Sequence, residues 1–114
     1  MTAADAIEDI KRLKARYCRC HDTKDWPGLR AVFTDDLVAD STEAGGRVVD
    51  GADAFIAFLQ EVLAGATTVH QGHMPEIELT SPTTATGIWA LHDIAIWPPG
   101  LPLDGHGHYH ETYP

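Results

Sequence analysis

The hydrophobic pattern of this chain changes from mainly helical to strand-like near residue 66, and that change most limits the possible folds. Before it, apart from a short segment at residues 37–51, apolar side chains recur every three or four residues, as on one face of a helix. From residue 67 onward, longer segments have the composition and alternation of β-strands. Helices followed by strands predict an α+β domain with helices packed on one face of a curved antiparallel sheet. We expect residues 1–114 to form a single domain.

The first helix is predicted over residues 3–21. Its apolar stripe carries Ile7, Ile10, Leu13 and Tyr17, and charged side chains occupy the remaining face. On such a stripe a tyrosine adds core area, but its hydroxyl needs a hydrogen-bond partner. Tyr17 can therefore be a core residue or part of a site.

Three further elements precede the long strands. A short helix follows Asp25 as N-cap and Pro27 in the first turn, and should end near residues 34–36. The segment 37–51 predicts a hairpin around the turn EAGG. Residues 52–65 predict a third helix that ends at a glycine.

Two long strands are expected over residues 67–79 and 83–97, and a third begins at Asp104. In the second of these, Asp93 shares a face with Trp89. A carboxylate in apolar surroundings must be solvated, paired or protonated. Asp93 therefore either ties down backbone groups or takes part in proton transfer.

His70 and His73 lie three positions apart, with Gly72 between them. Strict alternation would place His73 on the same face as Ile77. A bulge near the glycine would instead turn His70 towards that face. The spacing leaves core packing, metal binding and acid–base chemistry open.

His106, His108 and His110 alternate along the last strand and should share one face, opposite Tyr109. Such a row can bind a metal when a carboxylate or another histidine joins it from a neighbouring element. The alternative is a polar face at the rim of the sheet, and our preferred interpretation includes no metal and no cofactor.

Composition limits the partners. Seventeen acidic residues against eight basic ones give a formal charge of −9. This charge disfavours nucleic acid and anionic membrane surfaces, and a small neutral or cationic ligand fits it better. The partner that we predict is a small hydrophobic molecule. No apolar run approaches the roughly 20 residues of a membrane span, and the charged N-terminus does not resemble a signal peptide, so a cytoplasmic protein is expected. Cys18 and Cys20 point in different directions on the helix, which predicts reduced, packing cysteines.

The motifs AIEDIKRLKARYCRCHDTKDW and VHQGHMPEIEL, followed by TTATGIWALHD, resemble the SnoaL-like members of the nuclear transport factor 2-like superfamily. The resemblance covers nearly the whole chain. It implies a cone formed by a curved sheet and N-terminal helices over its concave face. Bile acid 7α-dehydratases are the most similar family, and scytalone dehydratases and steroid Δ-isomerases are similar more distantly.

The resemblance also implies a site. It places the functional residues at Tyr17, Asp22, His70 and Asp93, with Asp93 supporting His70 and with His73 as a neighbour. In the alternative arrangement, Asp22 shares the proton transfer or pairs with His70. The family pattern continues into a last strand that carries a functional arginine, whereas this sequence stops at residue 114. We therefore expect the sheet to lack that strand.

The predicted function is a cofactor-independent dehydratase that acts on a hydrophobic, polycyclic or aromatic hydroxy-carbonyl compound. Trp89, Phe55, His73 and Tyr109 are the predicted substrate-binding residues. The alternatives are an isomerase and a non-catalytic module that binds a small ligand or dimerises. A curved open sheet usually covers its outer face, so a homo-oligomer is expected.

Overall fold

The computed structural model describes residues 2–98 and 100–114. The order of elements confirms the predicted α+β class. They are α1 (Ala3–Asp22), α2 (Trp26–Arg30), β1 (Val38–Asp40), the 3₁₀ turn η1 (Thr42–Ala44), β2 (Val48–Asp50), α3 (Ala52–Val62), β3 (Thr67–Ser81), β4 (Thr84–Trp97) and β5 (Leu101–Tyr113).

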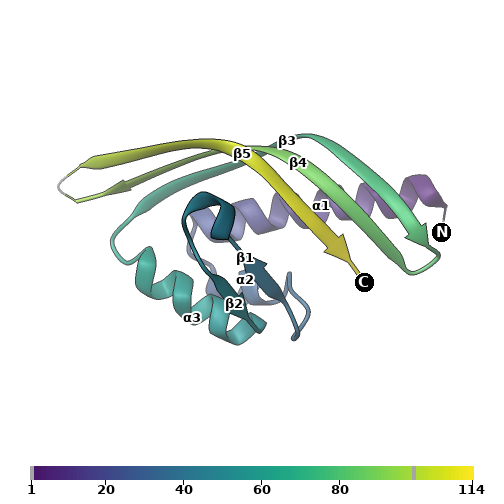
Figure 1. The fold of residues 1–114 in the computed structure, drawn as a ribbon, viewed down its shortest axis with the longest axis horizontal. Helices are drawn as coiled ribbons and strands as arrows, with labels where there is room; N and C mark the ends of the chain where they lie inside the picture. The colour runs from purple at the N-terminus through teal and green to yellow at the C-terminus, as the bar shows by residue number, and fades with distance from the viewer. Residues whose placement is uncertain (1, 99) are drawn as a thin grey trace.

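The long strands form an antiparallel sheet in the order β3-β4-β5, and β1 pairs with β2 in a separate hairpin. The large sheet curves over the helices, with α1 lying along its concave side and α2, α3 and the hairpin on that same side (Figure 1). The sheet is open, and β3 and β5 are its edges. The side of the sheet away from α1 is called the outer face below.

α1 begins with a capping box, in which the Thr2 hydroxyl accepts a hydrogen bond from the Asp5 backbone and the Asp5 carboxylate accepts one in return. The predicted apolar stripe of Ile7, Ile10, Leu13 and Tyr17 is half-buried. Lys14 and His21 are more deeply buried, at 5% and 4% exposure. Both continue the spacing of Ile7 and Tyr17 along the helix. The face that packs against the sheet is therefore apolar at one end and polar at the other.

α2 begins as predicted and ends earlier. The Asp25 carboxylate caps it by accepting a hydrogen bond from the Gly28 backbone at 3.0 Å. The helix ends at Arg30, so the predicted end near residues 34–36 is wrong. Turns take over after Arg30, whose guanidinium pairs with carboxylates at Asp35 and Asp53. The single turn of helix is enough to bury Leu29 completely.

The hydrophobic core joins α1, α2 and α3 below the sheet. Cys20, Leu29, Ile56, Leu59 and Leu63 are its main buried members. Cys18 and Cys20 are both free thiols, as predicted, and Cys20 packs in this core. Within residues 2–98 and 100–114, no helix combines the length and the apolar character needed to cross a membrane.

A bulge in β3 decides which histidine faces the helices. His70 pairs with Asp93 and His73 pairs with Ala90, but Glu76 pairs with Ile88. Three steps along β3 therefore match two steps along β4, so β3 contains one extra residue, next to Met74 at a φ of +47°. The extra residue reverses the alternation. His70 therefore faces α1, on the same side as Ile77 and Leu79 beyond the bulge, and His73 points to the outer face of the sheet.

Candidate functional site

The first part of the candidate site is a hydrogen-bonded pair of His70 and Asp22. Asp22 is the last residue of α1, and its Oδ1 lies 2.6 Å from Nδ1 of His70. The same carboxylate accepts hydrogen bonds from the His70 backbone at 2.9 Å and from the Thr68 hydroxyl at 3.0 Å. The helix end is thereby fixed to β3 through one carboxylate. A carboxylate on Nδ1 favours the tautomer that leaves Nε2 of the imidazole free to accept a proton.

A second imidazole lies against this pair. The His21 ring stacks on the His70 ring, with centroids 3.9 Å apart and planes 16° apart. Both nitrogens of His21 are buried without a hydrogen-bond partner among the described residues. Burial, and then the neighbouring His70, lower the pKa of His21 from 6.5 to about 3. His21 therefore remains a neutral ring beside His70, and the sequence analysis did not select it.

Tyr17, Tyr109 and Asp93 form the second part of the site. The rings of Tyr17 and Tyr109 meet edge to face, and Tyr109 donates to Oδ2 of Asp93 at 3.3 Å. Burial raises the pKa of both tyrosines, so they remain protonated donors. Burial also raises the pKa of Asp93, whose Oδ1 is buried without a partner among the described residues. This group contains two hydrogen-bond donors and a carboxyl whose pKa burial raises.

The structure favours the alternative arrangement of the sequence analysis, in which Asp22 pairs with His70. Asp93 was expected to support His70, but Asp22 takes the hydrogen bond to Nδ1 of His70. Asp93 lies directly opposite His70 in the β3–β4 ladder, yet its carboxylate interacts with Tyr109. The reason is geometric, because the end of α1 brings a carboxylate to the His70 ring. All four predicted catalytic side chains still lie on the concave side.

Lys14 is a buried cation at the site that the sequence analysis placed on the charged face of the helix. Its Nζ lies 2.7 Å from Oε2 of Glu111. The ammonium also lies over the rings of Tyr17 and Tyr109, at 4.3 and 3.4 Å from their centroids. Its position four residues before Cys18 and three before Tyr17 is the signal that could have identified it.

The ion pair continues into a network of hydrogen bonds. The Tyr113 hydroxyl donates to Oε1 of Glu111 at 2.6 Å and accepts from Nε1 of Trp89 at 3.0 Å. Gly87 makes room for the Tyr113 ring, because a Cβ at this glycine would lie 2.8 Å from the hydroxyl. The network connects β4 and β5 to α1 beside the site.

A pocket of about 510 Å³ opens between α1 and β3. Its walls include Lys14 and Cys18 from the helix, and His70 and Trp89 from the sheet. His73 borders it at the β3 edge, although it points away from the His70 face. Three of the predicted residues, His70, His73 and Trp89, therefore meet at one pocket.

The other predicted substrate-binding residues lie in an aromatic series. Tyr109 contacts Tyr17 with ring centroids 6.0 Å apart, Tyr17 contacts Phe33 at 6.0 Å, and Phe33 contacts Phe55 at 5.6 Å. Each pair meets edge to face, which is a favourable geometry. Phe55 is therefore joined to the tyrosines through Phe33 and packs beside the hydrophobic core.

The structure is a small α+β protein with a cluster of titratable side chains under a curved sheet. Comparison with known families gives the same class, because residues 2–114 match the SnoaL-like domain. The chain belongs to the SnoaL-like domain family.

Several solved structures are similar to that of this chain, among them the following three. A protein from Novosphingobium aromaticivorans, provisionally named an aromatic ring hydroxylase, has a TM-score of 0.91 at 20% identity, over 98% of this chain and 80% of that chain. Another protein from the same organism, provisionally named a scytalone dehydratase, has a TM-score of 0.84 at 22% identity, and the match covers 98% of this chain and 76% of that chain. A hexachlorocyclohexane dehydrochlorinase of type 2 has a TM-score of 0.85 at 17% identity, and the match covers 96% of this chain and 75% of that chain. These similarities establish the fold.

Proposed function

We propose that this protein is a cofactor-independent lyase that eliminates water from a hydrophobic hydroxy-carbonyl compound. The observation that carries the proposal is the 2.6 Å contact between Asp22 and Nδ1 of His70 at a ring that borders the pocket. A base held in one tautomer at a binding pocket suits removal of an acidic C–H proton.

In the proposed reaction, Nε2 of His70 removes the proton on the carbon next to the carbonyl. The electron pair of that C–H bond forms an enolate, and the Asp22 carboxylate stabilises the imidazolium that results. A base placed in this way typically accelerates a reaction by about 10²–10⁴-fold. Asp22 acts as a positioning residue because it holds the ring and does not contact the substrate.

The second step expels the hydroxyl group from the neighbouring carbon. The enolate electrons form the new C=C bond as the C–O bond breaks, and the departing oxygen takes a proton from the imidazolium of His70. Tyr17 is the proposed donor to the enolate oxygen, since burial keeps its hydroxyl protonated. Asp93, whose pKa burial raises, is the second candidate source of the departing proton.

The substrate class follows from the surroundings of the base. Trp89 lines the pocket, and the aromatic series from Tyr109 to Phe55 reaches the base through Tyr17, whose ring centroid lies 6.4 Å from that of His70. Flat apolar surfaces of this kind suit a ring system. The resemblance to bile acid 7α-dehydratases supports a polycyclic compound. The names of two structural neighbours also denote eliminations, of water in one case and of hydrogen chloride in the other.

Self-association belongs to the same proposal. The edge strands β3 and β5 present backbone groups that a second copy could pair with. Light scattering coupled to size exclusion should give a mass above the 12.4 kDa of one chain. A mass of one chain at micromolar concentration would contradict this part.

The test of the catalytic proposal is proton–deuterium exchange in heavy water, followed by NMR on a panel of cyclic ketones and enones. We expect the wild type to exchange the proton next to the carbonyl, and His70→Ala to lose that exchange. Asp22→Asn should lower it by at least about tenfold, because the ring loses its orienting charge. His110→Ala, on the exposed outer face, is the matched control and should behave as the wild type.

An isomerase would show the same exchange but move a double bond without releasing water. A binding module would show saturable ligand binding without exchange, and binding would survive in His70→Ala. That last result, with a correctly folded wild type, would overturn the catalytic proposal.

A further inference from the structure

The outer face of the sheet is rich in histidine. The chain has seven histidines, and His21 and His70 are the two on the concave side. The strand registers place the other five on the outer face: His73, His92, His106, His108 and His110. The proposed elimination uses none of the last four.

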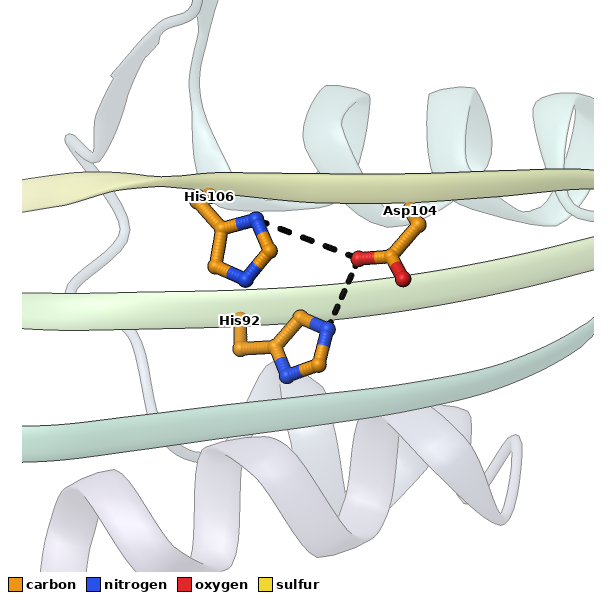
Figure 2. A group of neighbouring side chains, drawn as sticks. All are labelled: His92, Asp104 and His106. Carbon is orange, nitrogen blue, oxygen red and sulfur yellow. Dashed lines mark hydrogen bonds and ion pairs between the residues drawn. The ribbon is translucent and has the colours of Figure 1, made fainter.

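Two of these histidines meet a carboxylate. His92 on β4 lies directly opposite His106 on β5, and their rings stack with centroids 4.3 Å apart. Asp104 lies two residues before His106 on the same face of β5. Its Oδ1 is 2.7 Å from Nε2 of His92 and 3.9 Å from Nδ1 of His106 (Figure 2). The three side chains turn towards one another above the two strands.

We propose that His92, Asp104 and His106 form a binding site for a divalent transition-metal ion of the zinc type. Two imidazoles and one carboxylate are a ligand set that zinc uses in proteins, with the remaining position open. One donor atom from each of the three residues lies within 4.8 Å of the other two. No other group of three potential ligands this close was found among the described residues.

The observed spacing needs only a small adjustment to hold an ion. Zinc lies about 2.0–2.2 Å from nitrogen and carboxylate oxygen, so two ligands of one tetrahedral ion are about 3.3–3.6 Å apart. Oδ1 of Asp104 lies 3.9 Å from Nδ1 of His106, slightly beyond this spacing, and 2.7 Å from Nε2 of His92, where the hydrogen bond must lengthen to admit the ion. The three donor atoms all lie within 4.8 Å of one another, and rotation of exposed side chains can bring them to the tetrahedral spacing.

The exposure of the three side chains suits an ion that keeps bound water. The side chain of His92 is 33% exposed, that of Asp104 60% and that of His106 72%. Solvent can therefore complete the coordination. The formal charge of −9 on the chain adds a general attraction for a cation.

The site would connect two strands of the sheet. His92 comes from the central strand β4, while Asp104 and His106 come from the edge strand β5. An ion held by both strands binds the folded chain and not the unfolded one, so it should raise the melting temperature. The alternative is a surface hydrogen bond between His92 and Asp104 with no metal affinity.

The test is titration of the metal-free protein with zinc chloride by isothermal calorimetry, after treatment with a chelator and dialysis. We expect one ion per chain. His92→Ala, Asp104→Asn and His106→Ala should each weaken binding by at least about tenfold, since even the loss of a group that only orients a ligand costs 10–100-fold. The melting temperature of the wild type should rise with zinc, and that of His106→Ala should not.

Two controls separate this site from others. His110→Ala removes an exposed histidine from the same strand and face, and it should keep full affinity. His70→Ala should also keep it. The proposal is overturned if the wild type does not bind zinc, if His92→Ala or His106→Ala binds as tightly as the wild type, or if only His70→Ala loses binding. Circular dichroism confirms that each variant is folded.

Discussion

The imidazole of His21 lies flat against that of His70, 3.9 Å between centroids, and makes no hydrogen bond of its own among the described residues. His70 is therefore held on two sides, by a carboxylate at its edge and by a neutral ring on its face. The ring restricts the orientation of His70 and shields it from water. The cost is a buried polar group without a partner.

Because the His21 ring is buried without a hydrogen-bond partner in the described part of the chain, the protein should lose stability in acid, and replacing His21 should remove that loss. The pKa of His21 is about 3 in the folded chain and 6.5 as its ordinary value. Below pH 6.5 the unfolded chain takes up a proton that the folded chain does not, so the free energy of unfolding falls as the pH drops towards 3. His21→Phe keeps the stacked ring and removes this loss. Between pH 7 and pH 4, the wild type should lose about 2–3 kcal/mol more stability than the variant.

Urea denaturation at pH 7, 5 and 4 measures the difference. His110→Ala, which removes an exposed histidine, should follow the wild type at all three pH values. Parallel stability curves for the wild type and His21→Phe would show that His21 is protonated in the folded chain.

Lys14→Met should be strongly destabilising. The substitution leaves Glu111 with a charge that has lost its cation, on a side chain that is 25% exposed. Breaking a buried ion pair costs about 3–5 kcal/mol, and the partial exposure of Glu111 favours the lower end. Lys14→Met combined with Glu111→Gln should recover part of the loss in urea denaturation. Lys11→Met, on the exposed side of the same helix, should change stability by less than about 0.5 kcal/mol.

Gly87→Ala tests the close approach of Tyr113. The added methyl group would lie 2.8 Å from the Tyr113 hydroxyl, so the ring must move and its hydrogen bonds to Trp89 and Glu111 must lengthen. We expect a loss of about 1–2 kcal/mol and a changed tryptophan emission spectrum. Gly107→Ala is the matched control on β5, where the nearest atoms would be 3.9 Å away. Equal stability of the two variants would contradict the steric argument.

Asp93→Asn should stabilise the protein at neutral pH and lower its activity. Burial raises the pKa of Asp93 above 3.8, its ordinary value. At pH values between 3.8 and the raised pKa, the folded chain therefore keeps a proton that the unfolded chain has released. Stability therefore falls as the pH rises through this range. The amide removes the penalty, and the gain should be visible at pH 7 and absent near pH 3. A variant that is less stable at pH 7 would show that the charged form is stabilised in the fold.

The hydrophobic periods were sufficient to predict the fold class and most elements. The amphipathic first helix, the hairpin over residues 37–51 and the long strands all lie close to their predicted bounds. These features depend on local spacing, which a sequence displays directly. The end of α2 was not predictable in this way, because the ion pairs of Arg30 with Asp35 and Asp53 depend on the tertiary arrangement.

The candidate site was predictable in its residue types and less so in its pairings. Tyr17, Asp22, His70 and Asp93 came from the family resemblance, and all four lie on the concave side. Which aspartate holds His70 depends on where the last turn of α1 meets β3, and no sequence spacing records that distance. Lys14 was missed because charged residues were assigned to the solvent face, and His21 was not selected at all. The helical spacing nevertheless places both on the buried side of α1.

The single extra residue beside Met74 exchanges the two faces of the sheet for the residues that follow it in β3 up to Leu79. Deleting one residue there would restore strict alternation, and either the segment with His70 or the segment from Glu76 to Leu79 would then present its opposite side to α1. Relatives aligned by hydrophobic pattern alone across this point would have the wrong histidine matched to the site. The count of residues between His70 and Ile77 is therefore as important to the chemistry as the identity of either one.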